Sequence, residues 1–161
     1  CSGSGAIAVA LDKISGAEVT AVEIDETAFS YLETNLKENN SSVKPVMADA
    51  LEICETFADG ELDLIVSNPP YIKSADIETL QKEVRLEPRL ALDGGEDGCD
   101  FYREIVSRWS RKLKKGGALA FELGENQADA VKALMTDKGF SDFKISLDFG
   151  GVQRAIIGTL L

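Results

Sequence analysis

Residues 62–71 read Leu-Asp-Leu-Ile-Val-Ser-Asn-Pro-Pro-Tyr. The apolar first half predicts a buried strand, so the segment Asn68-Pro69-Pro70-Tyr71 lies where that strand ends and a loop begins. In open α/β sheets, ligands bind outside the carboxyl ends of the strands. The tetrapeptide is therefore a candidate binding segment.

The Asn-Pro-Pro-Tyr segment is predicted to be stiff. Two prolines fix two φ angles and remove two backbone donors, and Pro69 biases Asn68 towards an extended shape. What remains is a carboxamide, backbone carbonyls without partners and the aromatic face of Tyr71, a set that suits holding a planar NH2 group. The alternative is a simple turn in which Tyr71 caps the core. The strand before the segment and the glycine-rich start of the chain favour the binding role.

Strand-like and helix-like stretches alternate along the chain. Strands are predicted at 18–24, 43–48, 62–67, 118–123, 143–147 and 154–161, and helices at 6–13, after Asp25, at 100–113 and at 127–137. This alternation predicts an α/β fold with a doubly wound, mostly parallel, Rossmann-like sheet. The last two strands are predicted to form an antiparallel edge hairpin. The length of 161 residues predicts one domain, residues 1–161.

Residues 72–99 interrupt this alternation with one proline, three glycines and many charges. Long excursions of this kind are usually functional or disordered. Glu87, Asp93 and Asp97 stand beside proline or glycine and are predicted to accept hydrogen bonds from local backbone donors. Phe101 and Trp109, in the helix that follows, are predicted to pack in the core.

The chain starts with the small-residue loop Cys1-Ser2-Gly3-Ser4-Gly5, which leads directly into a predicted helix. Such loops let the backbone approach a ligand and direct helix N-terminal NH groups at an anion, although a tight turn alone explains them equally well. In a doubly wound sheet the strand before this loop is central. We therefore expect the natural protein to continue upstream and to supply that first strand.

Acidic residues follow the next two strands. Glu23 comes about 20 residues after the loop, the spacing at which an acidic side chain meets ribose hydroxyls, and Asp49 ends the third strand. Either residue taken alone is more simply a solvated side chain. Because the carboxyl ends of neighbouring strands meet at one crevice, the loop, Glu23 and Asp49 together favour a nucleotide-like ligand.

Composition narrows the function classes. The formal net charge is −11, with 28 acidic against 17 basic residues, which disfavours binding to nucleic acid. The small basic group at 111–115 is predicted to be solvated charge at a helix end. The chain has no histidine, so neither a zinc site nor a histidine-dependent triad is expected. No apolar stretch predicts a membrane span, and three widely spaced cysteines predict the reducing cytoplasm.

These motifs resemble the class I S-adenosylmethionine-dependent methyltransferases and, more closely, the catalytic domain of the HemK/PrmC family of release factor glutamine methyltransferases. Asn-Pro-Pro-Tyr alone is shared with DNA adenine and RNA guanine methyltransferases and indicates only the reaction type. The stretch Glu-Pro-x-x-Ala-Leu at 87–92 and Gly-Gly-x-Asp-Gly at 94–98 is more specific. The resemblance extends to Glu122, Gly124 and Arg154. The resemblance does not cover the family's first strand and helical N-terminal domain, and Cys1 stands where the family often has glycine.

The resemblance implies S-adenosylmethionine as cofactor, with no metal and no general base. The implied cofactor contacts are Cys1, Ser2, Gly3, Ser4, Gly5, Glu23, Asp49, Ala50 and Asn68. The implied catalytic residues are Asn68, Pro69, Pro70 and Tyr71. The Asn68 carboxamide and the Pro69 carbonyl would accept the two protons of a substrate amide, Pro70 would keep the segment rigid, and Tyr71 would pack on the amide plane.

The implied substrate is a glutamine side chain of a peptide chain release factor, methylated in the cytoplasm. One alternative is a glutamine of a ribosomal protein, and another is an exocyclic amine of a nucleic acid, which the acidic balance disfavours. A binding module or inactive homologue is a different class of protein, and the intact Asn-Pro-Pro-Tyr argues against it. Which release factor is modified, the oligomeric state and the activity without the first strand stay open.

Overall fold

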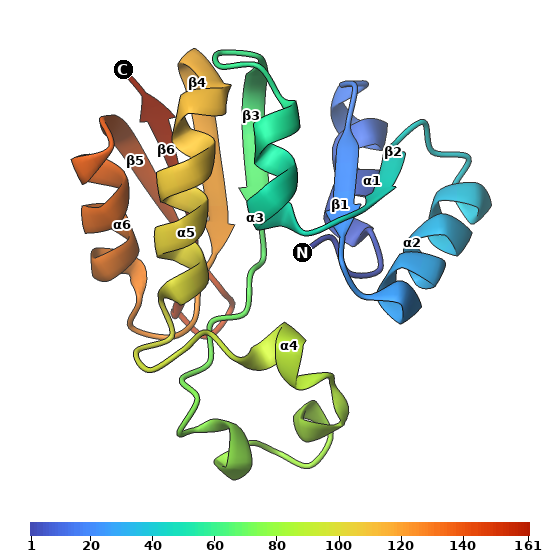
Figure 1. Ribbon diagram of the computed structural model, residues 1–161. Coiled ribbons are helices and arrows are strands. Elements are labelled where there is room, and N and C mark those ends of the chain that lie inside the picture. Colours follow the sequence, from blue (N-terminus) through green and yellow to red (C-terminus); the bar gives the residue numbers. More distant parts are fainter. The chain divides into compact units, whose positions relative to one another are not determined.

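The computed structural model describes residues 1–161, which form two compact units, Cys1–Glu55 and Thr56–Leu161 (Figure 1). Each unit carries its own strands and helices. No helix has the length and apolar character needed to cross a membrane.

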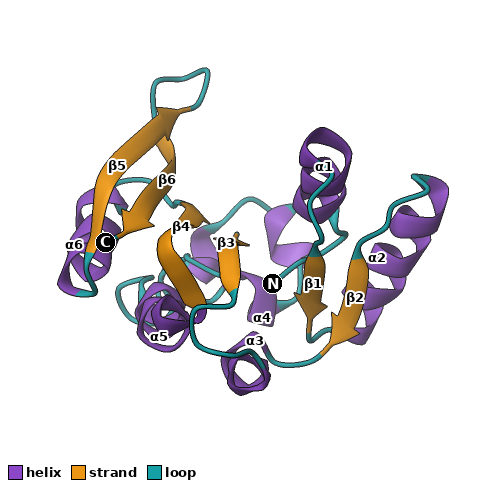
Figure 2. Ribbon diagram, turned by 90° about the horizontal axis from the view of Figure 1, so that it is seen from above, coloured by secondary structure: helices purple, strands orange, loops and turns teal.

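The first unit contains two parallel strands, which lie side by side in Figure 2. Its elements are α1 (Ala6–Ser15), β1 (Thr20–Glu23), α2 (Glu26–Glu38), β2 (Lys44–Met47) and the short α3 (Ala50–Ile53), which continues into a 3₁₀ turn, η1 (Cys54–Thr56). The core consists of Ala8, Ala21, Leu32, Leu36 and Val43. Helix α2 begins after Asp25, whose side chain accepts the Ala28 N–H, as the sequence predicts.

The second unit is built on one four-stranded sheet in the order β3-β4-β6-β5. Its elements are β3 (Leu62–Ser67), η2 (Ile77–Thr79), η3 (Val84–Leu86), α4 (Arg89–Leu92), α5 (Asp100–Trp109), η4 (Ser110–Lys112), β4 (Leu113–Glu122), α6 (Ala128–Asp137), β5 (Phe140–Leu147) and β6 (Gln153–Leu160). Strands β3 and β4 are parallel, while β6 pairs antiparallel with both β4 and β5. The predicted α/β fold with an antiparallel C-terminal hairpin is confirmed.

The carboxyl ends of β3 and β4 meet at one edge of this sheet, and the excursion 72–99 lies beyond that edge (Figure 1). Strand β6 starts at the same edge, because the Leu123 N–H bonds to the Arg154 carbonyl at 2.9 Å. Helices α5 and α6 cover one face of the sheet. Trp109 is 7% exposed and packs against Phe57, so its predicted core position is confirmed.

Two element predictions need correction. Strand β4 begins at Leu113 rather than at Ala118, because the pairing with β3 shifts register across Gly116 and Gly117. A Cβ on Gly117 would lie 2.8 Å from the Lys114 carbonyl, so this glycine permits an irregularity inside the strand instead of ending the helix before it. The sequence also did not predict α3, which is only four residues long.

The basic group at 111–115 is not simply solvated. The Lys112 ammonium is buried and donates to the Phe57 carbonyl and to Asp59, both at 2.8 Å. Lys114 pairs with Asp63 at 2.8 Å. The prediction of solvated charge is therefore wrong for Lys112, because a neighbouring loop supplies a carbonyl and a carboxylate that replace water around the ammonium.

Candidate active site

The glycine-rich loop of the first unit depends on left-handed backbone at two positions. Gly3 has φ 53° and Gly5 has φ 84°. A Cβ on Gly5 would lie 2.4 Å from Leu32 Cδ1, whereas a Cβ on Gly3 would meet nothing within 4 Å. Gly5 therefore satisfies internal packing, while Gly3 leaves a bare and open stretch of backbone that a ligand can approach.

Helix α1 begins directly after this loop without a side-chain cap. The backbone N–H groups of Ala6, Ile7 and Ala8 have no hydrogen-bond partner in the chain. Free N–H groups and the positive end of the helix dipole favour an anion at this point.

Glu23 ties the loop to the end of β1. It is 6% exposed and accepts the N–H groups of Gly3 at 2.7 Å, Ile24 at 2.9 Å and Asp25 at 3.0 Å. Burial by itself would raise the pKa of Glu23, but the backbone hydrogen bonds from Asp25, Gly3 and Ile24 outweigh it and lower the pKa. An ionised carboxylate has about four acceptor positions, so about one remains for a ligand.

The other predicted residues of the first unit lie near the ends of β1 and β2. The backbone nitrogen of Cys1 lies 3.7 Å from Glu23 Oε2, and the Ser2 N–H donates to the Val22 carbonyl at 3.0 Å. Asp49 caps α3 by accepting the Leu51 N–H at 2.7 Å through Oδ1, and its Oδ2 has no hydrogen bond. Ala50 is the first residue of α3. No group of three or more acidic or cysteine side chains in the structure could hold a metal ion.

The Asn-Pro-Pro-Tyr segment of the second unit follows β3, as predicted. Asn68 is exposed, whereas Pro69 and Pro70 are buried. The Asn68 carboxamide oxygen and the carbonyl oxygens of Asn68, Pro69 and Pro70 accept no hydrogen bond from the chain. We call residues 68–71 the acceptor shelf, because these oxygens have no hydrogen-bond partner in the chain.

The ring of Tyr71 is held from two sides. Its hydroxyl donates to Glu122 Oε1 at 3.4 Å, at the end of β4. Burial raises the pKa of Tyr71, the charge of Glu122 raises it further, and Arg154 at the start of β6 opposes this rise. Arg154 itself is paired with Asp148 at 2.9 Å. Two of the three residues that extended the family resemblance, Glu122 and Arg154, thus act on the shelf tyrosine.

The three acidic residues that were predicted to shape the excursion behave differently. Asp93 accepts the N–H of Gly95 at 3.1 Å, and Asp97 accepts the N–H of Cys99 at 3.0 Å, so the predicted loop-shaping role is confirmed for both. The carboxylate of Glu87 makes no hydrogen bond and is exposed, so the same prediction is wrong for Glu87. The Glu87 N–H bonds to Val84 and closes a 3₁₀ turn, and this turn leaves the side chain free.

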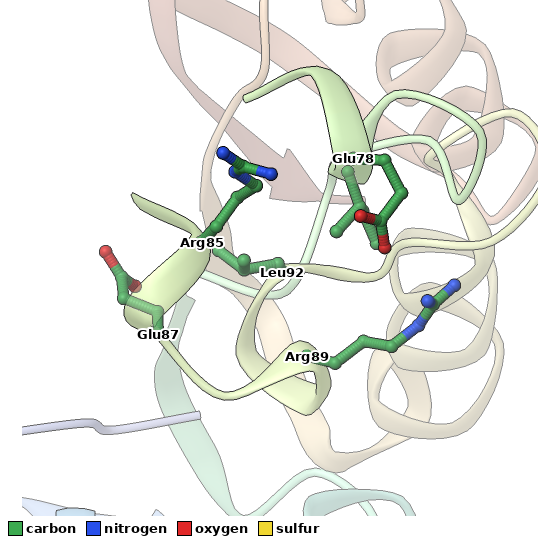
Figure 3. Close-up of a pocket in the computed structure, with 6 residues that line it drawn as sticks. Glu78, Arg85, Glu87, Arg89 and Leu92 are labelled. Carbon is green, nitrogen blue, oxygen red and sulfur yellow. The ribbon is translucent and has the colours of Figure 1, made fainter. Parts of the chain in front are cut away.

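Glu87 instead lines an open pocket of about 330 Å³ within the excursion (Figure 3). The lining residues are Ile77, Glu78, Arg85, Glu87, Arg89 and Leu92. Ile77 and Leu92 are each 6% exposed and form an apolar base, and the side chains around them carry both signs of charge. A polyphosphate ligand would meet two carboxylates here, so this mixture suits a peptide better than a nucleic acid.

The sequence analysis missed Gln127. This residue is 8% exposed, and its side chain donates to the Tyr71 carbonyl at 2.9 Å. The available signal was its place three residues after Gly124, where a carboxamide follows the end of a buried strand and begins a helix. That signal does not name a partner, because Tyr71 is 56 residues away in the sequence.

Comparison with known proteins places these features in a family. Residues 1–90 match the family model described as the methyltransferase small domain, which is more than half of the chain. The chain belongs to the methyltransferase small domain family. The match includes the glycine-rich loop, Glu23, Asp49 and the acceptor shelf.

Individual relatives and a solved structure agree with this assignment. The chain is 43% identical to a release factor glutamine methyltransferase of Geobacter sulfurreducens, with 98% of this chain and 55% of the relative covered. It is 37% identical to one of Clostridium acetobutylicum, covering 98% and 56%. The crystal structure of a methyltransferase from Pyrococcus furiosus superimposes with a TM-score of 0.75 at 25% identity, covering 98% of this chain and 71% of that one. The chain spans about half the length of the curated relatives it matches, and the predicted family resemblance is confirmed.

Proposed function

We propose that the chain is the catalytic domain of a cytoplasmic S-adenosylmethionine-dependent methyltransferase that modifies a glutamine side-chain amide of peptide chain release factors. The observation that carries the proposal is the acceptor shelf, in which Asn68 and Pro69 offer free oxygens on a stiff backbone. The names of the relatives support the choice of substrate.

The residues of the first unit fit the chemical groups of S-adenosylmethionine. Its carboxylate suits the free N–H groups at the start of α1, and a ribose hydroxyl suits the remaining acceptor position of Glu23. Cys1 to Gly5 would border the methionine moiety, and Asp49 and Ala50 the adenine. The bound cofactor supplies an electrophilic methyl group on a sulfonium, which is a good leaving group.

The residues of the second unit fit the substrate amide, a weak nucleophile because its nitrogen lone pair is delocalised. The Asn68 carboxamide and the Pro69 carbonyl each accept one N–H of the substrate, and together they fix the direction of the nitrogen. The Tyr71 ring packs on the amide plane, and Pro70 limits motion of the shelf. Such positioning can lower a barrier by roughly 7–11 kcal/mol. The same oxygens stabilise the positive charge that develops on the nitrogen. S-adenosylhomocysteine would leave as the thioether, and the nitrogen would release one proton to water to give the N-methyl amide.

The first test uses the full-length protein. We expect calorimetric titration with S-adenosylhomocysteine to give binding in roughly the micromolar range, near −8 kcal/mol. We then expect radiolabelled methyl transfer to a release factor, located on one glutamine by mass spectrometry. A release factor with that glutamine replaced by asparagine is the matched control and should stay unlabelled.

Three outcomes would contradict the proposal. Labelling of ribosomal protein in preference to a release factor would favour the ribosomal-protein alternative. Labelling of RNA or DNA, with binding that weakens steeply as salt is raised, would favour a nucleic-acid methyltransferase. Binding of S-adenosylhomocysteine without transfer to any of these substrates would leave a binding module.

A further inference from the structure

Gln127 stands at the start of α6 and makes a buried network of hydrogen bonds with its side-chain carboxamide. Nε2 donates to the Tyr71 carbonyl at 2.9 Å and to the Gly98 carbonyl at 3.1 Å. Oε1 accepts the Gly124 N–H at 2.9 Å and lies 3.3 Å from the Tyr102 hydroxyl. One side chain thus connects the acceptor shelf, the excursion, the end of β4 and α5.

The orientation of this carboxamide follows from its neighbours. A backbone carbonyl can only accept and a backbone N–H can only donate, so Nε2 must face Tyr71 and Gly98 while Oε1 faces Gly124. The Tyr102 hydrogen is shared, because its hydroxyl also lies 2.8 Å from the Glu122 carbonyl. Both protons of the Gln127 amide are used, and no smaller or apolar side chain could replace these bonds.

The hydrogen bond from Gln127 distinguishes Tyr71 from the other residues of the acceptor shelf. Of the four shelf carbonyls, only that of Tyr71 accepts a hydrogen bond from the chain. The carbonyls of Asn68, Pro69 and Pro70 accept no hydrogen bond from the chain, so only the last residue of the shelf is held by one. Pro69 and Pro70 have fixed φ angles, and the position of Tyr71 therefore restricts where Asn68 can lie.

Glycines allow this close approach. A Cβ on Gly98 would lie 2.5 Å from the Tyr71 carbonyl oxygen and 2.6 Å from Gln127 Nε2. A Cβ on Gly124 would lie 2.6 Å from Gln127 Oε1 and 2.9 Å from the Tyr71 ring. A Cβ on Gly94 would lie 2.8 Å from the Tyr71 Cα. Backbone from two segments, the excursion and the end of β4, is thus packed around Tyr71 and Gln127 with no room for side chains.

We infer that Gln127 is a positioning residue for the methyl-transfer step. It holds the Tyr71 carbonyl against Gly98 and so sets the direction of the free oxygens on Asn68 and Pro69, which it does not itself touch. This inference rests on the proposed function and adds a residue to it. Its physical basis is the sensitivity of oriented reactions to small displacements of the reacting groups.

The test replaces Gln127 by methionine in the full-length protein, which keeps the length of the side chain and removes all four hydrogen bonds. We expect the single-turnover rate of glutamine methylation to fall roughly 100-fold. The KM for the release factor and the Kd for S-adenosylhomocysteine should stay within about threefold, because misdirected shelf oxygens should cost mainly stabilisation of the transition state. A folded Gln127→Met protein with a wild-type rate overturns the inference.

A matched control separates positioning from general loss of stability. Val131→Ala removes volume from a fully buried side chain on the same helix, away from the shelf. We expect Val131→Ala to lower the melting temperature while leaving the single-turnover rate within about twofold of wild type at a temperature well below unfolding. If Val131→Ala slows methylation as much as Gln127→Met, Gln127 acts through stability and the inference is wrong.

Gln127→Glu is a second variant for the case in which methionine prevents folding. It preserves the shape and the acceptor for Gly124, but it presents a carboxylate oxygen instead of an N–H to the Tyr71 and Gly98 carbonyls, so the same loss of rate is expected. NMR of the substrate-free protein provides a readout that does not require the proposed function. We expect ¹H–¹⁵N shifts for Tyr71 in both variants and not in Val131→Ala. Unchanged Tyr71 signals in both variants overturn the inference even if the wild type methylates no release factor.

Discussion

The glycine-rich loop and the acceptor shelf are both held in place at strand ends, but by opposite means. In the loop, the candidate ligand-binding residue Glu23 also fixes the backbone, because its carboxylate accepts three backbone N–H groups. In the shelf, the candidate binding oxygens of Asn68 and Pro69 make no internal bonds. The holding is done by two prolines and by Gln127, which bonds only to Tyr71 within the shelf.

This difference matches the two tasks we propose. A cofactor with many polar groups can be bound by residues that also serve the protein's own structure, since each contact contributes only part of the affinity. A weakly nucleophilic amide must be oriented by acceptors that have no competing partner. Changes at the shelf should therefore affect rate strongly, and changes at the loop should affect cofactor affinity more mildly.

The largest effect is expected for Asn68→Ala, which removes a free acceptor without disturbing any internal hydrogen bond. We expect the rate of methyl transfer to fall roughly 100-fold or more, as loss of a positioning group can cause. The Kd for S-adenosylhomocysteine and the melting temperature should be nearly unchanged. Ser67→Ala is the neighbouring control and should keep the wild-type rate. Wild-type turnover in Asn68→Ala would remove Asn68 from the mechanism.

The next largest effect is expected for Gly98→Ala, which tests whether packing around Tyr71 is needed. The added Cβ would overlap the Tyr71 carbonyl and Gln127, so we expect a loss of about 1–3 kcal/mol in the free energy of unfolding. Gly60→Ala is a matched control, because Gly60 also has positive φ, at 71°, but has open space around it. Denaturant unfolding measures both, and equal losses would show that backbone strain alone matters at Gly98.

A smaller effect is expected for Glu23→Gln, which tests the loop. The neutral amide keeps the shape but weakens the bonds from Gly3, Ile24 and Asp25, so we expect the Kd for S-adenosylhomocysteine to rise about tenfold, equivalent to about 1.4 kcal/mol. The rate at saturating cofactor should stay near wild type. Glu26→Gln, an exposed change in α2, is the calorimetric control. A reduced rate with unchanged affinity would reverse the comparison between loop and shelf.

A still smaller effect on stability is expected for Gly3→Ala. The position has φ 53° and open space, so the added Cβ costs about 1 kcal/mol of backbone strain without overlap. Gly16→Ala, at φ 64° and equally open, should lose a similar amount of unfolding free energy. Only Gly3→Ala should also weaken the binding of S-adenosylhomocysteine, as measured by calorimetry. Equal affinities in the two variants would show that no ligand approaches Gly3.

The smallest effect is expected for the exposed ion pair between Asp97 and Arg103, which joins the excursion to α5. Hydrogen bonds from Arg103 lower the pKa of Asp97 from 3.8 to about 2. Because the folded-state pKa is lower, the pair stabilises the protein above about pH 4, and this contribution is lost as the pH falls towards 2. Asp97→Asn should differ from wild type slightly at pH 7 and not at pH 2 in denaturant unfolding. A large difference at pH 7 would mean that the ion pair, and not Gln127, holds the excursion on the shelf.

Sequence reasoning located β3 and the start of α2 correctly because their signals are local. The apolar run 62–67 predicted β3, and the side chain of Asp25 predicted the start of α2. The error at Lys112 concerns partners that lie far away in the sequence, whereas the error at Glu87 concerns a local turn. Lys112 is buried because the Phe57 carbonyl and the Asp59 carboxylate accept hydrogen bonds from its ammonium. The carboxylate of Glu87 has no partner, because the 3₁₀ turn bonds only the backbone N–H of Glu87.

The sequence by itself determined the stiff acceptor shelf and the open glycine loop, since proline restricts φ and glycine permits positive φ wherever they occur. Only the tertiary structure decided what holds them. Gln127 meets Tyr71 across 56 residues and Gly98 across 29, and Glu23 meets Gly3 across 20. Side-chain hydrogen bonds act over about 3 Å, so a partner can be named only after the strands have brought the distant segments together.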